Sequence, residues 1–409
     1  LSKEYAITLL LVLPAAAFTL RNYKTAAALK SIWVPAVVFL LYALIRAKIV
    51  GWSATEQTDP LNNPYIYATG IEKFATKIYI LLKYILLLVK PFPLSADYSY
   101  AQIQFRTFAD WDVWVSAALN ISLIYYTIRS VLKRKLIGLL GVIYLSNLFL
   151  ISNFLFNIGA SMGERFLFHS SFAFCVAVSL GLDLLKTKMK IQVFNFVVII
   201  FLAGISVVSF LVIIPRNRDW KNSYTLFLKD VQTSPNSALC NANATSALVN
   251  LALVPENSLQ KDSLLKKAIA HSNKAISIHP GFSNAFFNRA VCDYHLANYD
   301  SAFVYWEKGF ALFNSAPHKT HFSELVYKKA LTEGEQKHFD TAIKLLEWSV
   351  KISPGNAAWW SDLGGAYFSV NRLQDAKSCW EKALSIDPNE IQASKALPFI
   401  NQKLLETAN

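Results

Sequence analysis

The sequence predicts an all-α protein in which a polytopic transmembrane helical domain is followed by a solenoid of helical repeats. Residues 1–215 contain long apolar runs separated by short basic segments. Residues 216–409 are more polar, and Pro354 and Pro388 lie 34 residues apart in them. The composition changes directly after Pro215, so we expect a membrane domain over 1–215 and a repeat domain over 216–409.

The composition favours a membrane protein. Hydrophobic residues make up 54% of the chain and charged residues 16%, against about 25% charged residues in an average soluble domain. Residues 1–215 hold 19 Lys+Arg against 9 Asp+Glu, whereas residues 216–409 hold 21 against 18. A basic excess in the apolar half indicates anionic membrane lipids or a phosphate-bearing lipid as partners. The sequence contains no nucleic-acid-binding motif, so we expect no nucleic-acid partner.

The apolar half contains six to seven candidate spans. A crossing takes about 20 mostly apolar residues, because lipid offers no partner for a free backbone amide. Six segments fit this requirement: 5–20, 31–46, 111–129, 136–152, 166–185 and 191–214. A seventh, 72–90, carries four lysines around an apolar centre. It either spans the bilayer, with its lysines reaching the headgroups, or lies flat at the interface.

Basic turns set the expected orientation. Residues 133–135 and 186–190 are rich in lysine and arginine, and the positive-inside rule places both turns in the cytoplasm. The loops 91–110 and 153–165 then lie on the outer face together with the repeats. That face is the periplasm of a bacterium or the lumen of the endoplasmic reticulum. An interfacial 72–90 obeys the charge rule throughout, and we favour it.

The period of the second half is that of a tetratricopeptide repeat. The last repeat has large, small and helix-ending residues in the expected order: Trp360, Leu363, Gly364, Tyr367, Ala376, Trp380, Ala383 and Pro388. Small residues at Gly364 and Ala376 let two antiparallel helices approach closely. Earlier units run over 323–356 and from about 283, with a six-residue insertion near Pro317. An irregular unit ending at Pro280 and a half-unit over 220–235 precede them, which gives about four repeats.

Such a solenoid has a groove that binds an extended peptide or a partner helix. Four aromatic side chains are candidates to line it: Phe287, Tyr294, Tyr327 and Phe368. The alternative is that these side chains pack between the helices.

Two expected outer loops carry ionisable residues near the membrane surface. Two prolines stiffen the loop that ends in Asp97. Glu164, Arg165 and His169 lie where another span begins, and ionisable groups at this depth are costly and often functional. Arginine binds phosphate through paired donors. The alternatives are that Glu164 and Arg165 orient helices, that Arg165 anchors at the headgroups, and that His169 packs between helices.

The remaining polar residues give weaker signals. Lys3 and Glu4 at the start of the first apolar segment either cap a helix or bind substrate. The cysteines, at 175, 240, 292 and 379, form no CxxC pair and are expected to be small buried residues. No metal cluster or cofactor motif is evident. The chain begins at Leu1 without a signal peptide, and we expect a fragment whose N-terminal part is missing.

Three motifs in order resemble one family. They are Ser2-Lys3-Glu4 before an apolar helix, the Pro-Leu-Ser-Ala-Asp-Tyr-Ser loop at 93–99, and Gly163-Glu164-Arg165-Phe166-Leu167-Phe168 before a span. With the repeats that follow, they are similar to the transmembrane-and-TPR (TMTC-like) protein O-mannosyltransferases and their bacterial relatives. The family usually has proline where this chain has His169.

The resemblance implies a glycosyltransferase of the GT-C type. It would move a mannose-like sugar from a polyprenyl-phosphate carrier to a Ser or Thr hydroxyl of a protein on the outer face. By this resemblance, Lys3 and Arg165 hold the lipid phosphate, Asp97 and Glu164 orient those cations or the sugar, and the repeats present the acceptor. The family's catalytic base lies in a first outer loop that this sequence does not include, so no base is assigned.

Two other functions fit parts of the sequence. An O-antigen ligase or polymerase with fused repeats would use a lipid diphosphate donor, and its large outer loop would be rich in Arg and His, which the outer loops here are not. A non-catalytic, membrane-anchored scaffold for envelope assembly would account for the repeats and leave Asp97 and Arg165 without a role.

Overall fold

The computed structural model describes residues 4–50, 59–155 and 157–408, and every regular element in these ranges is helical. The chain forms two compact units, Leu1–Pro280 and Gly281–Asn409. The first unit therefore contains all the apolar helices and also the first helices of the repeat half. The all-α fold class and the repeat solenoid predicted from the sequence are confirmed.

Apolar helices dominate residues 4–219. They are η1 (Glu4–Thr8), α1 (Leu9–Leu20), α2 (Thr25–Leu29), η2 (Lys30–Ile32), α3 (Trp33–Val50), α4 (Gly70–Val89), α5 (Trp111–Leu132), α6 (Leu136–Leu150), η3 (Glu164–Leu167), α7 (Phe168–Lys186) and α8 (Ile191–Asp219). Four segments are long and apolar enough to cross a membrane: Thr25–Ile49, Trp111–Leu132, Glu164–Lys186 and Ile191–Asp219. Two expected spans are shorter apolar helices, at 5–20 and 136–150.

The centre of the apolar bundle is α6, which packs against α1, α5 and α7. Its side chains Leu140, Tyr144 and Leu148 are buried with Tyr84 from α4. The α8 helix, in contrast, buries none of its side chains. Because apolar side chains avoid water, an apolar helix with no buried side chain is typical of contact with lipid.

The α8 helix continues beyond the expected end of its apolar run. The sequence predicts a span over 191–214 that stops at Pro215, but the helix includes Pro215 and ends at Asp219. Proline inside a helix removes one backbone donor and crowds the carbonyl four residues earlier, so it disfavours this continuation. The last turn is held instead by side chains, since Arg216 pairs with Asp219 at 3.4 Å and with Asp230 at 2.9 Å.

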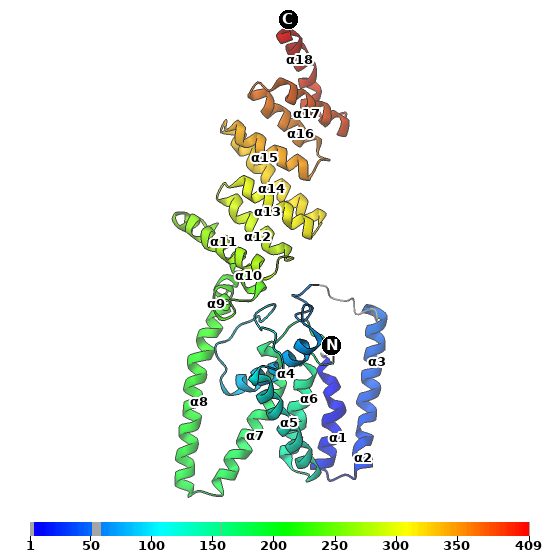
Figure 1. The fold of residues 1–409 in the computed structure, drawn as a ribbon, viewed down its shortest axis with the longest axis vertical. Helices are drawn as coiled ribbons and strands as arrows, with labels where there is room; N and C mark the ends of the chain where they lie inside the picture. Colours follow the sequence, from blue (N-terminus) through cyan, green and yellow to red (C-terminus); the bar gives the residue numbers. More distant parts are fainter. Residues whose placement is uncertain (1–3, 51–58, 156, 409) are drawn as a thin grey trace. The chain divides into compact units, whose positions relative to one another are not determined.

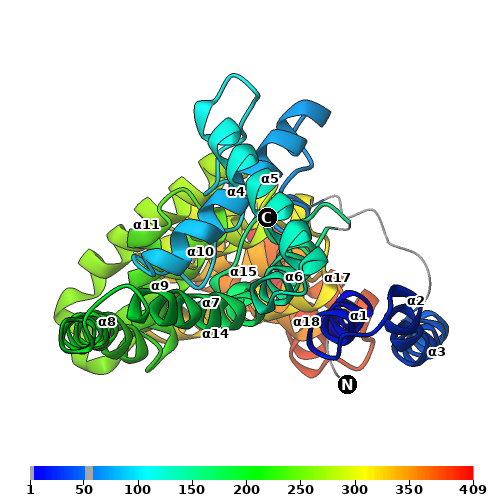
Figure 2. The same cartoon turned by 90° about the horizontal axis from the view of Figure 1, so that it is seen from below.

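The basic turns lie at one end of the bundle (Figure 1). Arg134 lies between α5 and α6. Its guanidinium donates to the carbonyl oxygen of Phe18 in α1, and to Asn22 Oδ1 and the Tyr23 carbonyl oxygen just after α1, at 3.0–3.3 Å. The α7–α8 turn lies at this end as well. The loop after α4 and the start of η3 lie at the opposite end. Figure 2 shows α4 along its length while α8, α1 and α3 are seen end on, so α4 lies crosswise to them.

The repeat half forms antiparallel helix pairs. The first unit contributes α9 (Ser223–Thr233), α10 (Ala238–Ala252), η4 (Pro255–Gln260) and α11 (Lys261–Ile278). The second unit contains α12 (Ser283–His295), α13 (Tyr299–Leu312), α14 (Ala316–Glu335), α15 (Phe339–Ile352), α16 (Ala357–Ser369), α17 (Leu373–Ile386) and α18 (Ile391–Ala408). Buried tryptophans at 306, 348, 359 and 380 belong to the hydrophobic core of the second unit.

The repeat period is visible in the turns. Ala297, Lys337 and Asn371 each have φ near +60° and each lie between the two helices of a pair. Lys337 and Asn371 are one period apart. The insertion expected near Pro317 lengthens α14, which has 20 residues where α12 and α16 have 13. Proline near the first position of α14 fits this, because the first backbone amides of a helix have no intrahelical acceptor.

Candidate functional site

A buried polar cluster, which we call the polar joint, links the apolar bundle to α9 and α10. It consists of Asp97, Glu164, Arg216, Asp230 and Ser237. These residues come from three regions that are far apart in the sequence, the 93–99 loop, the start of η3 and residues 216–237, and all belong to the first unit. Glu164, at the start of η3, accepts hydrogen bonds from the Ser95 amide and the Tyr98 hydroxyl, both at 2.6 Å. Glu164 thus fixes the 93–99 loop.

Asp97 connects that loop to the repeats. Its Oδ2 accepts from the amide of Ser99 at 3.0 Å, from the Ser99 hydroxyl at 2.7 Å and from the Ser237 hydroxyl at 2.8 Å. Ser237 is fully buried and caps α10 by accepting from the Cys240 amide. The Asp97 carboxylate, which the sequence predicts as a site residue, therefore holds Ser237, the N-cap residue of α10, in place.

Asp230 forms the second connection. This residue on α9 is 2% exposed, pairs with Arg216 and accepts from the Ala96 amide at 3.2 Å. Burial raises the pKa of the Asp230 carboxyl, and the positive charge of Arg216 works against that rise. Arg216 and Asp230 were not among the site residues predicted from the sequence. The signal that was present is an arginine directly after an apolar run, since a cation there needs a partner.

The polar joint also raises the pKa of a neighbouring thiol, that of Cys240. Burial, with the negative charge of Asp97 adding to it, raises the pKa of Cys240 to about 12. This thiol stays protonated at neutral pH and is a poor nucleophile. Cys292 and Cys379 are buried too, Cys175 is exposed on α7, and all four are free thiols. Within the described ranges, no three His, Cys, Asp or Glu side chains gather as metal ligands.

Arg165 and His169 lie outside the polar joint. Both side chains are exposed. Arg165 lies over the Phe166 ring at 5.2 Å, and His169 stacks on the Tyr5 ring at 4.3 Å. Lys3 lies outside the described residues. Glu4 opens η1, and its side chain is not described. The structure therefore brings Arg165 and His169 close to the first helix, while Asp97 and Glu164 take serines, a tyrosine and backbone amides as partners.

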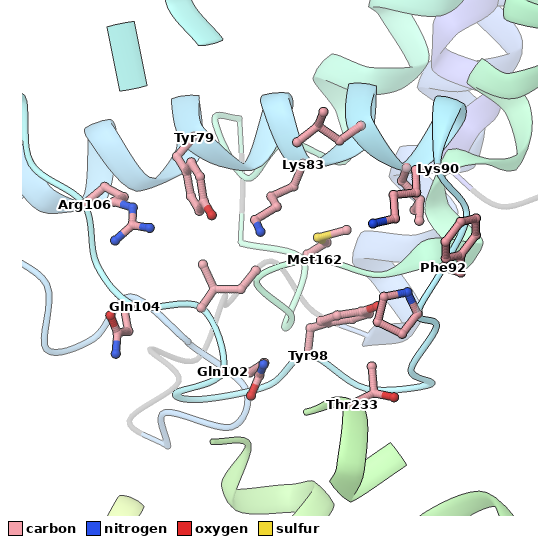
Figure 3. A pocket seen from close by; sticks show the side chains of 14 residues that line it. Tyr79, Lys83, Lys90, Phe92, Tyr98, Gln102, Gln104, Arg106, Met162 and Thr233 are labelled. Atoms are coloured by element: carbon pink, nitrogen blue, oxygen red, sulfur yellow. The ribbon is translucent and has the colours of Figure 1, made fainter. Parts of the chain in front are cut away.

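A cavity of about 470 Å³, which we call the α4 cavity, lies between α4 and the segment 92–106 (Figure 3). Three cationic side chains line it: Lys83, Lys90 and Arg106. Tyr79, Tyr98, Gln102 and Gln104 add neutral polar groups, and no Asp or Glu is among the lining residues. From the sequence, the lysines of α4 were predicted only to reach the lipid headgroups, and not to line a cavity.

The four aromatic candidates for a peptide groove take part in packing. Phe287 and Tyr294 are buried in the core of the second unit, 4% and 8% exposed. Tyr327 stacks on Trp359, with ring centroids 4.7 Å apart, and donates its hydroxyl to Asp362. Phe368 packs against Trp380 and Phe399. Of the two interpretations, the contacts of Phe287 and Tyr294 favour packing.

Comparison with known proteins first finds a family model that matches part of the repeat half. Residues 335–397, which run from the end of α14 into α18, match the family model described as Tetratricopeptide repeat. The crystal structure of MamA protein covers 43% of this chain and 87% of its own length, with 17% identity and a TM-score of 0.28.

Individual relatives are distant. The chain is 23% identical over 266 residues to Protein O-mannosyl-transferase TMTC3 of Mus musculus, covering 62% of this chain and 27% of that protein. The Homo sapiens protein of that name matches with the same identity over 267 residues. The TPR repeat-containing protein MJ1428 of Methanocaldococcus jannaschii is 24% identical over 140 residues, covering 33% of this chain and 24% of that protein. The chain thus spans about a quarter of the length of these relatives.

Proposed function

We propose that this protein is a membrane glycosyltransferase that moves a mannose-like sugar from a polyprenyl-phosphate carrier to a Ser or Thr hydroxyl of a protein. One observation carries the proposal. The similarity to Protein O-mannosyl-transferase TMTC3 covers 62% of the chain, which is more than either the apolar half or the repeat half contains. It therefore includes parts of both halves in the same order.

The transfer step needs a general base and a cation from the protein. The acceptor oxygen bonds to the anomeric carbon of the sugar while the bond from that carbon to the phosphate oxygen breaks. The hydroxyl proton passes to a general base, and the carrier leaves as polyprenyl phosphate with one more negative charge than before. A cation that meets this charge lowers the barrier. We assign no base among the described residues.

We propose Arg165 as the cation for the leaving phosphate. Its guanidinium is exposed and forms no ion pair with another described side chain, so its charge is available to a ligand. It directly follows Glu164, which fixes the loop that bonds to α10. We propose that the donor site lies at the end of the bundle from which the repeats begin, and that the repeats bind the acceptor polypeptide or its partners.

The orientation is part of the proposal. The turns at 133–135 and 186–190 carry three basic residues each, and both lie at one end of the bundle. The positive-inside rule assigns that end to the cytoplasm. Arg165, the polar joint and the repeats would then face the periplasm or the lumen. A polyprenyl-phosphate donor and a secreted acceptor meet on that face.

The test is a transfer assay with the full natural protein in neutral detergent, a short-chain prenyl-phosphate-mannose and a Ser/Thr peptide. We expect turnover by the unmodified protein and a loss of about 100-fold or more in Arg165→Ala. The matched control is Arg129→Ala on α5, an exposed arginine that donates a hydrogen bond to the Tyr125 hydroxyl at 3.2 Å. Normal turnover by Arg165→Ala would exclude Arg165 from the site.

Other outcomes separate the alternatives. Absence of transfer by the unmodified protein, together with specific capture of envelope proteins by the repeats, would favour a non-catalytic scaffold. Transfer only from a lipid diphosphate donor would favour an enzyme related to the O-antigen ligases.

A further inference from the structure

We propose that the α4 cavity holds the phosphate of a membrane lipid whose headgroup carries hydroxyl groups. This is a second anionic-ligand site, because Arg165 is not among the residues that line the cavity. It rests on the charge, shape and surroundings of the cavity alone, and it does not require sugar transfer.

The first observation is a concentration of positive charge that the protein leaves uncompensated. Lys83 and Lys90 form no ion pair among the described side chains, and their ammonium groups lie over the rings of Tyr79 and Phe92 at 5.3 and 5.2 Å. Arg106 is partly neutralised by Asp112 at 3.1 Å. Like charges that line one cavity repel each other, so a bound anion would relieve the repulsion.

The second observation is the direction of these side chains. Tyr79, Lys83, Leu86 and Lys90 recur at intervals of three and four residues, which places them on one stripe of α4 and its C-cap. Figure 3 shows the ammonium groups of Lys83 and Lys90 and the guanidinium of Arg106 directed toward the same space. Ammonium and guanidinium groups around one centre are the usual partners of a phosphate.

The rest of the lining points to a hydroxylated headgroup. Gln102 and Gln104 present side-chain amides, and Tyr79 and Thr233 present hydroxyls. These groups both donate and accept hydrogen bonds, as a sugar or a glycerol headgroup requires. A cavity of about 470 Å³ lies within the range of small-molecule sites, roughly 300–1,000 Å³.

The third observation favours a lipid over a free phosphate. Leu86 and Phe92 line the cavity and are 52% and 42% exposed, so apolar surface adjoins the cations. On the other side of α4, Ile85, Leu88 and Val89 line an apolar cavity of about 340 Å³ bounded by α5, α6 and α7. A ligand with a phosphate and a hydrocarbon chain satisfies both the charged and the apolar surfaces.

The test is native mass spectrometry of the purified full chain in neutral detergent. The probes are short-chain prenyl-phosphate-mannose, dioctanoyl phosphatidylglycerol, dioctanoylglycerol and inorganic phosphate. We expect one molecule of a phosphate-bearing lipid per chain, and no comparable binding of dioctanoylglycerol or inorganic phosphate. Lys83→Gln/Lys90→Gln should weaken binding about 100-fold, because each substitution removes a charged hydrogen-bond donor.

Two variants serve as controls. Lys133→Gln/Lys135→Gln removes the same charge from the opposite end of the bundle and should bind the lipid normally. Lys83→Arg/Lys90→Arg keeps the charge and should retain binding, which guards against a loss caused by misfolding. Equal loss in the Lys133→Gln/Lys135→Gln protein would indicate general attraction to the surface and would overturn the proposal, as would full binding by Lys83→Gln/Lys90→Gln.

The probes also distinguish the source of the lipid. Preference for prenyl-phosphate-mannose would make the α4 cavity a second binding site for the donor lipid, and preference for phosphatidylglycerol would make it a phospholipid site. Either result supports a lipid phosphate in the cavity. Inorganic phosphate binding as tightly as the lipids would contradict it. Because binding is read without turnover, failure of the transfer assay with binding retained would remove the proposed function and leave this site.

Discussion

Two neighbouring glycines of α16 have opposite surroundings. A Cβ atom on Gly364 would lie 2.6 Å from Trp380 Nε1 and 2.7 Å from its Cδ1. Trp380 cannot move aside easily, because it is buried and its Nε1 donates to the Ser361 carbonyl at 3.0 Å. A Cβ on Gly365 would meet nothing within 4 Å. The sequence predicts a close approach at Gly364, and the structure confirms it.

We therefore predict effects of opposite sign for Gly364→Ala and Gly365→Ala. Alanine is the better helix former by about 0.5–1 kcal/mol, so Gly365→Ala should stabilise the repeats by about that amount. Gly364→Ala should destabilise them by about 1–2 kcal/mol, because overpacking outweighs the helix gain. Thermal unfolding followed by tryptophan fluorescence measures both. Stabilisation by Gly364→Ala would show that the helices separate freely there.

Arg216 and Asp230 depend on each other. Asp230 is a buried carboxyl whose pKa is raised, with Arg216 holding the rise in check. Loss of Arg216 should raise that pKa further. A carboxyl with a raised folded pKa binds its proton more tightly in the folded state, so its contribution to stability falls as the pH rises above the unfolded value of about 3.8.

We predict that Arg216→Ala costs about 3 kcal/mol at pH 8, because it leaves a buried charge unpaired. The loss should be smaller at pH 5, where the lone carboxyl more readily takes up a proton. Denaturant titration followed at Trp220, whose ring lies 5.7 Å from the Arg216 guanidinium, measures the loss. The control is Arg218→Ala, because Arg218 is an exposed arginine two residues further along α8. A loss that does not change with pH would contradict the role given to Asp230.

At the scale of elements, the turns inside the three helix pairs of the second unit, α12–α13, α14–α15 and α16–α17, each use a left-handed residue. Ala297, Lys337 and Asn371 have φ of 60°, 63° and 63°. Asparagine tolerates this conformation, whereas alanine and lysine are strained by about 1–2 kcal/mol. Sequence periodicity placed the turns but did not show which residue takes the strained conformation.

Lys337→Gly should therefore stabilise the α14–α15 pair by about 0.5–1 kcal/mol, since glycine adopts positive φ without strain. The control is Lys328→Gly in the middle of α14, which should destabilise by about 1 kcal/mol. Hydrogen exchange of the α14 and α15 amides reports both changes locally. Destabilisation by Lys337→Gly would mean that the lysine side chain, and not the backbone, decides the stability of this turn.

At the scale of the whole molecule, the proposed orientation assigns opposite ends of the first unit to opposite faces of a membrane. In a Cys175→Ser background, Ser258→Cys in η4 should react with an impermeant maleimide from the outer face. Lys188→Cys in the α7–α8 turn should react only after permeabilisation. Cys240, Cys292 and Cys379 should not react with the maleimide, because burial raises the pKa of each thiol to about 12. Reaction of Ser258→Cys only from the cytoplasmic side would reject the orientation and the transfer proposal with it.

The architecture could be predicted from the sequence because its signals are local. A run of apolar residues or a 34-residue period is set by neighbours within one helix pair, so the all-α class, the apolar helices and the repeat positions follow directly. Single residues such as Gly364 could be assigned for this reason too. The sequence predicts a span over 191–214; the structure adds that the helix continues to Asp219, where Arg216 pairs with Asp230 on α9.

The partners of the polar residues were decided only by the tertiary structure. Asp97 and Glu164 were predicted to matter, but their partners include Ser237, which is 140 residues from Asp97, and Tyr98, which is 66 residues from Glu164. The α4 cavity depends in the same way on how the segment 92–106 returns to α4. Hydropathy and spacing constrain a side chain's environment along its own helix, whereas ion pairs and cavities depend on which loops meet, and no local pattern encodes that.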